Sequence, residues 1–158
     1  MASIKQAAEV FLSVRRIAVT GVSRSGDSHG SNVVYKRLRE VGYDVFAVNP
    51  NAEEVEGDRT YADLAAIPDG VEAVVIGTKP DHAEGAMRQA VDLGITRVWM
   101  HRSFGGGSVS AAATEYGRAH AVTVIDGGCP LMFGRTSDGA HRFMCRILKL
   151  TGAVPRTV

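Results

Sequence analysis

The chain has 158 residues, of which 45% are hydrophobic and 22% are charged, a composition that indicates one globular domain over residues 1–158 and excludes a disordered chain. Its 18 Lys and Arg residues against 17 Asp and Glu residues leave a formal net charge of +1, so bulk charge predicts no nucleic-acid partner. Two cysteines exclude a disulfide framework, and without a long apolar run or a basic N-terminal segment we expect a cytoplasmic protein that does not enter a membrane.

Five short apolar runs predict β-strands. They lie at residues 17–20, 44–48, 74–76, 97–100 and 122–126. Each is rich in Val and Ile with little polar alternation, which is typical of parallel strands buried on both faces.

Helical periodicity fills the segments between these runs. Helices are predicted near Ser3 and over residues 31–41, 81–93, 110–120 and 139–150, with a short helical piece at 61–66. The apolar residues of the first helix that share one face are Ile4, Ala7, Ala8, Phe11 and Leu12, and those of the last helix are Phe143, Met144, Ile147 and Leu148. This alternation predicts an α/β fold: a doubly wound, five-stranded parallel sheet of Rossmann-like or flavodoxin-like type. We expect the strand order 3-2-1-4-5, with the ligand site outside the carboxyl ends of the strands at the topological switch beside the first strand.

The loop after the first strand is the strongest candidate for a ligand site. It runs from Gly21 to Ser31 and contains three glycines and four serines. Such a loop before a helix N-terminus suits a pyrophosphate, because backbone N–H groups can approach the anion closely; the alternative is an ordinary flexible connection with a helix cap. It matches neither Gly-x-Gly-x-x-Gly nor a P-loop, and Asn49-Pro50-Asn51 stands where an NAD site needs a carboxylate.

Three further loops meet at the same edge of the predicted sheet. Thr78-Lys79-Pro80 opens a helix, where Lys79 adds positive charge to a phosphate site or is simply solvated. His101-Arg102 begins a second Gly-rich loop, in which a hydrogen-bonded loop histidine is an alternative to a functional one. Cys129 is either a reactive thiol or a small side chain packed beneath the Pro130 turn.

Several of these segments resemble a known family. They are Gly21-Val22-Ser23-Arg24, Val48-Asn49-Pro50, Asp63-Leu64-x-x-Ile67-Pro68, Ile76-Gly77-Thr78-Lys79-Pro80, Gly94-Ile95-x-x-Val98 and Gly128-Cys129-Pro130. In this order they look like the stand-alone CoA-binding proteins, whose domain is similar to the N-terminal CoA-binding domain of the succinyl-CoA synthetase α-subunit. The resemblance covers roughly residues 15–130.

The resemblance implies that coenzyme A is the ligand, with its pyrophosphate on the Gly/Ser loop and its adenine beside the end of the second strand. The implied binding residues, together with those placed at the same edge by the strand pattern, are Gly21, Val22, Ser23, Arg24, Ser31, Asn49, Pro50, Asn51, Thr78, Lys79, Pro80, His101, Arg102 and Cys129. Many relatives carry a lysine where this chain has Asn51. Arg24, Lys79 or Arg102 then meets the 3′-phosphate, or the ligand is another adenine nucleotide.

Two functions remain open. One is a non-catalytic module that binds CoA or an acyl-CoA, and the alternative is a small NADP-dependent oxidoreductase. The first is favoured because no acid, base and nucleophile are placed together in the sequence, and no substrate domain follows. No metal site is predicted, and the edge strands and the amphipathic last helix permit a homodimer without requiring one.

Overall fold

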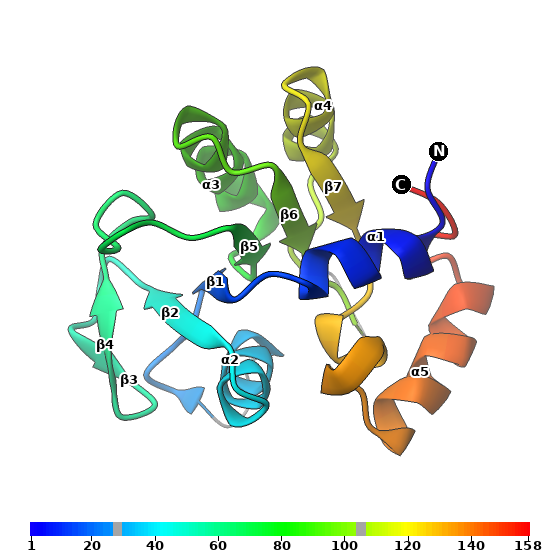
Figure 1. The fold of residues 1–158 in the computed structure, drawn as a ribbon, viewed down its shortest axis with the longest axis horizontal. Helices are drawn as coiled ribbons and strands as arrows, with labels where there is room; N and C mark the ends of the chain where they lie inside the picture. The colour runs from blue at the N-terminus through cyan, green and yellow to red at the C-terminus, as the bar shows by residue number, and fades with distance from the viewer. Residues whose placement is uncertain (27–29, 104–106) are drawn as a thin grey trace.

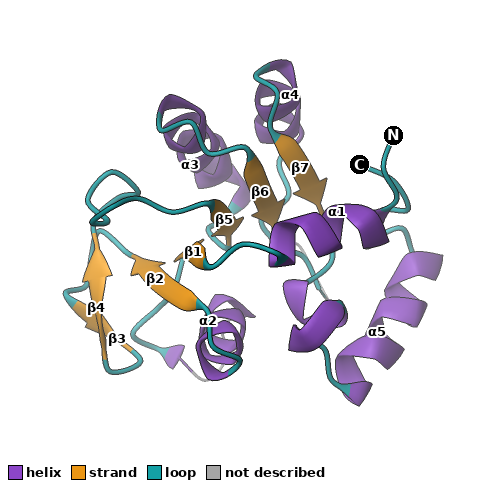
Figure 2. Cartoon of the chain, in the orientation of Figure 1, coloured by secondary structure: helices purple, strands orange, loops and turns teal. Residues whose placement is uncertain are grey.

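The computed structural model describes residues 1–26, 30–103 and 107–158, and it has helices on both faces of one sheet (Figures 1 and 2). The strands are β1 (Arg16–Thr20), β2 (Asp44–Val48), β3 (Glu54–Val55), β4 (Asp58–Tyr61), β5 (Ala73–Ile76), β6 (Arg97–Met100) and β7 (Thr123–Asp126). The helices are α1 (Ile4–Leu12), α2 (Gly30–Glu40), α3 (Pro80–Asp92), α4 (Ala111–Ala119) and α5 (Gly139–Leu150). Two 3₁₀ turns, η2 (Pro130–Met132) and η3 (Gly134–Thr136), connect β7 to α5.

The sheet confirms the predicted Rossmann-like α/β class but holds seven strands rather than five. Its order is β3-β4-β2-β1-β5-β6-β7, and every pairing is parallel except that of β3 with β4. For the five predicted strands the observed order is 2-1-3-4-5, so the predicted order 3-2-1-4-5 was wrong: β4, which was not predicted, takes the place beside β2, and the strand at 74–76 pairs with β1 instead. The topological switch lies beside β1, which pairs with β2 on one side and β5 on the other.

Alternate residues of the central strands divide the core between the two faces of the sheet. Ile17 and Val19 of β1 pack with α1, α2 and α5, whereas Ala18 packs with α3 and α4. Strands that are covered on both faces have continuous apolar sequences. The five apolar runs therefore predicted β1, β2, β5, β6 and β7 correctly.

The two terminal helices show how far periodicity predicts packing. The predicted face of α1, which includes Phe11, is buried, and the Phe11 ring meets Trp99 edge-on at 5.3 Å between centroids. In α5, however, Phe143 and Ile147 point to solvent. The apolar face of α5 therefore extends beyond the residues that pack against the rest of the domain.

The segment at 61–66 was wrongly predicted as helical. Tyr61 is the last residue of β4 and pairs with Val48, and the residues after it form turns. Glu56 and Gly57, both at positive φ, form the two-residue turn between β3 and β4 that is typical of a tight hairpin. These strands are short and polar, so no apolar run marks them.

Two glycines allow the ends of β1 and β5 to approach each other. A Cβ atom on Gly21, which has φ +76°, would lie 2.5 Å from the carbonyl oxygen of Gly77. A Cβ atom on Gly77 would lie 2.7 Å from the carbonyl oxygen of Thr20 and 2.0 Å from Oγ of Ser31. Any other residue at either position therefore forces backbone apart at the switch point.

We expect Gly21→Ala to lower the free energy of unfolding by about 3 kcal/mol, because it adds a positive-φ penalty to a backbone clash. Gly85→Ala is the control: this glycine lies within α3 and a Cβ there meets nothing within 4 Å, so the same change should be neutral or stabilising. Urea unfolding measures both. Equal effects of the two substitutions would contradict the packing described here.

Candidate functional site

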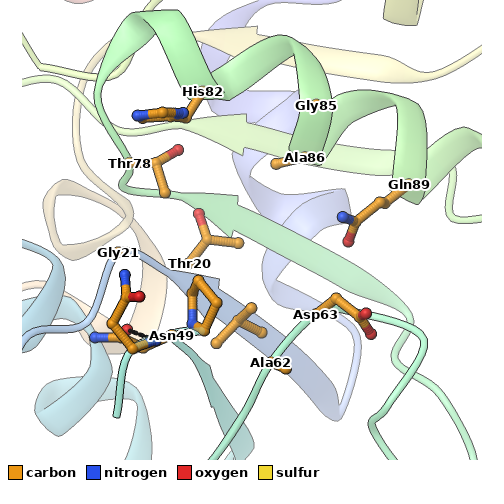
Figure 3. A pocket seen from close by; sticks show the side chains of 13 residues that line it. Thr20, Gly21, Asn49, Ala62, Asp63, Thr78, His82, Gly85, Ala86 and Gln89 are labelled. Atoms are coloured by element: carbon orange, nitrogen blue, oxygen red, sulfur yellow. Dashed lines mark hydrogen bonds between the residues drawn. The ribbon is translucent and has the colours of Figure 1, made fainter.

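A cleft of about 440 Å³ opens at the carboxyl edge of the sheet. It lies between the ends of β1, β2 and β5 on one side and α3 on the other (Figure 3). The residues that line it are Thr20, Gly21, Val48, Asn49, Pro50, Asn51, Ala62, Asp63, Thr78, His82, Gly85, Ala86 and Gln89. The cleft therefore lies at the topological switch, where ligands of open α/β sheets bind.

Five residues predicted from the sequence line this cleft. They are Gly21, Asn49, Pro50, Asn51 and Thr78. The loops that follow β1, β2 and β5 thus meet at one place, as parallel strands require.

The segment that leaves β1 is held from two sides by asparagine amides. The Asn49 amide donates to the carbonyl oxygen of Val22 at 2.8 Å. From α2, the Asn32 amide accepts from the Ser23 N–H at 2.9 Å and donates to the Ser23 carbonyl oxygen at 2.7 Å. Val22 itself is buried. The loop backbone is thus fixed before any ligand arrives, and the N–H of Ser23 is already used.

The start of α3 forms the opposite wall. Lys79 is the N-cap residue, without a side-chain cap, and Pro80 opens the helix; both side chains are exposed. The hydroxyl of Thr78 is buried and has no hydrogen-bond partner among the described residues, which leaves it free for a ligand. The charge of Lys79 and the positive end of the α3 dipole favour an anion at this end of the cleft.

Sequence reasoning missed the face of α3 that lines the cleft. His82, Gly85, Ala86 and Gln89 point toward it from successive turns (Figure 3). Their spacing of three, one and three residues defines a single helix face, and a glycine and an alanine on such a face leave room for a ligand. Asp63, from the segment wrongly predicted as helical, was missed as well.

Other predicted residues lie away from the cleft lining. Ser31 is buried and donates to the Gly77 carbonyl oxygen at 3.1 Å. The N–H of Arg102 donates to the Gly128 carbonyl oxygen at 2.8 Å, and its buried Nε has no partner among the residues that the structure describes. Arg24 is exposed. Positions 27–29 and 104–106 of the two Gly-rich loops lie outside the described residues.

Cys129 lies in the core rather than on the surface of the site. Its side chain is 3% exposed, and burial raises the pKa of its thiol to about 12. A thiol that stays protonated at neutral pH is a poor nucleophile, which favours the interpretation of Cys129 as a packing residue beside Pro130.

His101 is also enclosed, against the start of α2. A Cβ atom on Gly30 would lie 2.7 Å from Cε1 of its ring. Burial, followed by the charge of His141, lowers the pKa of His101 to about 4, so the imidazole is neutral at physiological pH.

The described residues offer neither a cluster of metal ligands nor a membrane-spanning helix. Within the described ranges, no three His, Cys, Asp or Glu side chains form a group suited to a metal ion. Of the helices that the structure describes, none is both long and apolar enough to cross a lipid bilayer.

Comparison with known proteins identifies the protein family to which most of the chain is similar. Residues 15–135 match the model of the CoA binding domain family. An uncharacterized protein of Bacillus subtilis (strain 168), YneT, is 25% identical over 125 residues, covering 73% of this chain and 92% of YneT. A hypothetical protein from Pyrococcus horikoshii OT3 is similar in structure, with a TM-score of 0.68, 28% identity and coverage of 78% and 87% of the two chains.

The same fold also occurs inside a much longer enzyme. The dinucleotide-forming acetyl-coenzyme A synthetase 1 of Ca. Korarchaeum cryptofilum gives a TM-score of 0.58 at 21% identity. The match covers 73% of this chain but 26% of the synthetase chain. At this identity, the likeness concerns the fold.

The lowered pKa of His101 predicts how stability changes with pH. Below about pH 6.5 the unfolded chain protonates this histidine, whereas the folded chain does not until about pH 4. The free energy of unfolding should therefore fall as the pH drops through this window, by up to about 1.4 kcal/mol per pH unit.

Urea unfolding at several pH values between about 5 and 6.5 measures this slope. His101→Gln should reduce it, whereas His82→Asn, which changes an exposed histidine, should preserve it. A wild-type slope that His101→Gln leaves unchanged would show that another group is responsible.

Proposed function

The chain belongs to the family of CoA-binding domains, and we propose that it binds coenzyme A, free or as an acyl-CoA, in the cleft between β1, β2, β5 and α3. The observation that carries the proposal is the position of this cleft at the topological switch, inside the segment that matches the family model. Loops from three neighbouring strands and one helix start supply its walls, as a nucleotide site requires.

The adenine is assigned to the part of the cleft next to the end of β2. Pro50 and Ala62 contribute apolar lining there, and Ala86 of α3 lies across the cleft from Ala62 (Figure 3). Asn51, Asp63 and Gln89 contribute polar groups to the lining. Such a site is mainly apolar with a few directional polar groups, as pockets for small ligands usually are.

The pyrophosphate is assigned to the segment from Gly21 to Arg24 and to the opposing start of α3. Because the Ser23 N–H already bonds to Asn32, the segment contributes the Ser23 hydroxyl and the Arg24 charge. Thr78 contributes its unpaired hydroxyl, and Lys79 and Pro80 follow it at the helix start. The positive charge of Arg24 suits a diphosphate.

The 3′-phosphate that distinguishes CoA from its dephospho form is assigned to Lys79. Of the three cations considered from the sequence, only Lys79 directly follows a residue that lines the cleft. It takes the place of the lysine that this chain lacks at Asn51. The buried positions Ser31 and Cys129 support the walls and are not assigned a contact with the ligand.

Calorimetric titration with CoA, dephospho-CoA, NADP and NAD tests the proposal. CoA should bind, and it should bind more tightly than dephospho-CoA. Gly85→Trp should weaken CoA binding at least about tenfold, because it fills the cleft from a helix position where a Cβ meets nothing within 4 Å.

Gly139→Trp is the matched control, since Gly139 is an exposed glycine of α5 whose Cβ would also be in open space. It should bind CoA like the wild type. Binding of NADP in preference to CoA would support the oxidoreductase alternative. Unchanged CoA affinity in Gly85→Trp would move the site away from this cleft.

A further inference from the structure

The turn of the β3–β4 hairpin directs a carboxylate inward. Glu56 occupies the first turn position at φ 51°, a conformation that costs energy for residues with a side chain. Its side chain is only 18% exposed, although turn residues normally face solvent. The inward direction therefore needs a structural reason, and the contacts of Glu56 supply one.

The Glu56 carboxylate contacts α2 and the loop that leads into it. Its Oε1 accepts a hydrogen bond from Nδ2 of Asn32 at 2.8 Å, and its Oε2 lies 3.7 Å from Nζ of Lys36. A Cβ atom on Gly26 would lie 2.3 Å from Oε1, so the loop backbone packs directly against the carboxylate. Glu56 thus joins the hairpin to the loop after β1.

The side-chain amide of Asn32 links Glu56 to Ser23 by hydrogen bonds. The Asn32 side chain is fully buried, and its Nδ2 group donates one hydrogen to Glu56 and the other to the Ser23 carbonyl oxygen. A carboxylate only accepts hydrogen bonds, so Glu56 requires Nδ2 on its side. The Oδ1 atom is then left for the Ser23 N–H, and a flipped amide would place two acceptors against each other.

The hairpin turn is itself anchored to α2. Arg39 donates to the Glu56 carbonyl oxygen at 3.0 Å and also pairs with Asp58. The Tyr35 hydroxyl donates to the same Asp58 carboxylate at 2.7 Å. These bonds hold the hairpin against the helix without the help of the Glu56 side chain, so the Glu56 carboxylate is available for a separate role.

We infer that Glu56 is a positioning residue for the ligand loop: through Asn32 it holds the Ser23 segment in its ligand-ready conformation. The ligand part of this inference rests on the proposed function, because the Ser23 segment is assigned to the CoA pyrophosphate. A loop held in advance loses less conformational entropy when the ligand binds. The hairpin, which adds only two short strands to the sheet edge, thereby acquires a function at the site.

Three variants separate this role from simple attachment of the hairpin. Glu56→Ala removes the acceptor for Asn32. Glu56→Gln keeps an acceptor oxygen but removes the charge. Glu54→Ala removes the same charge from an exposed position on the same hairpin. Amide hydrogen exchange of Ser23, compared with a core amide such as that of Val75, reports the local order of the loop without any ligand.

In Glu56→Ala the Ser23 amide should exchange at least about tenfold faster, with the Val75 amide unchanged, and CoA affinity should fall about tenfold. Glu56→Gln and Glu54→Ala should match the wild type in both measurements. Unchanged Ser23 exchange in Glu56→Ala would overturn the inference. Equal losses in Glu54→Ala or in Glu56→Gln would also overturn it, because charge alone would then be responsible.

The exchange measurement does not depend on the ligand. If the wild type fails to bind CoA, the proposed function fails, while faster Ser23 exchange confined to Glu56→Ala still supports the positioning role. If CoA binds and no variant alters Ser23 exchange, the proposed function stands and the role of Glu56 fails.

Discussion

The close approach of two backbones, at Gly21 and Gly77, is the constraint on which the rest of the site depends. A side chain on Gly21 would lie 2.5 Å from the Gly77 carbonyl oxygen. The chain turns in opposite directions from these two points: α2 follows β1 on one face of the sheet, and α3 follows β5 on the other. Thr20, Gly21 and Thr78 line the cleft, so this close approach fixes the relative position of the β1 and β5 ends that border it.

Next to the close approach of Gly21 and Gly77, hydrogen bonds fix the Val22–Ser23 segment, which would otherwise sample many conformations. Two asparagines, Asn32 and Asn49, satisfy three backbone groups of the Val22–Ser23 pair. A buried amide must find partners, and here its partners belong to the segment proposed to bind the pyrophosphate. The same bonds that satisfy the buried polar groups therefore also shape the ligand-facing surface.

The sequence predicted the parts of the fold that depend on local pattern. Apolar runs identified β1, β2, β5, β6 and β7, and the buried face of α1 was correct at each predicted position. The hairpin β3–β4 was missed because short, polar edge strands bury too little to leave a pattern. The exposure of Phe143 was missed because periodicity identifies an apolar face but not what covers it.

For the site, the sequence predicted its edge of the sheet and five of the lining residues, since loops after parallel strands must converge. The α3 face was missed because its small residues, Gly85 and Ala86, resemble an ordinary helix interior. The contact from Glu56 through Asn32 to Ser23 joins three distant segments. Such a contact depends on how the hairpin packs against α2, and local sequence patterns do not predict that packing.

A crystal structure of the protein with bound CoA tests the central claim most directly. The account predicts the adenine between Pro50 and Ala86, with phosphate oxygens within hydrogen-bond distance of Thr78 and the Gly21–Arg24 segment. CoA bound elsewhere, for example in the hollow of about 610 Å³ beside Arg118 and Thr157, with the cleft empty, would contradict it.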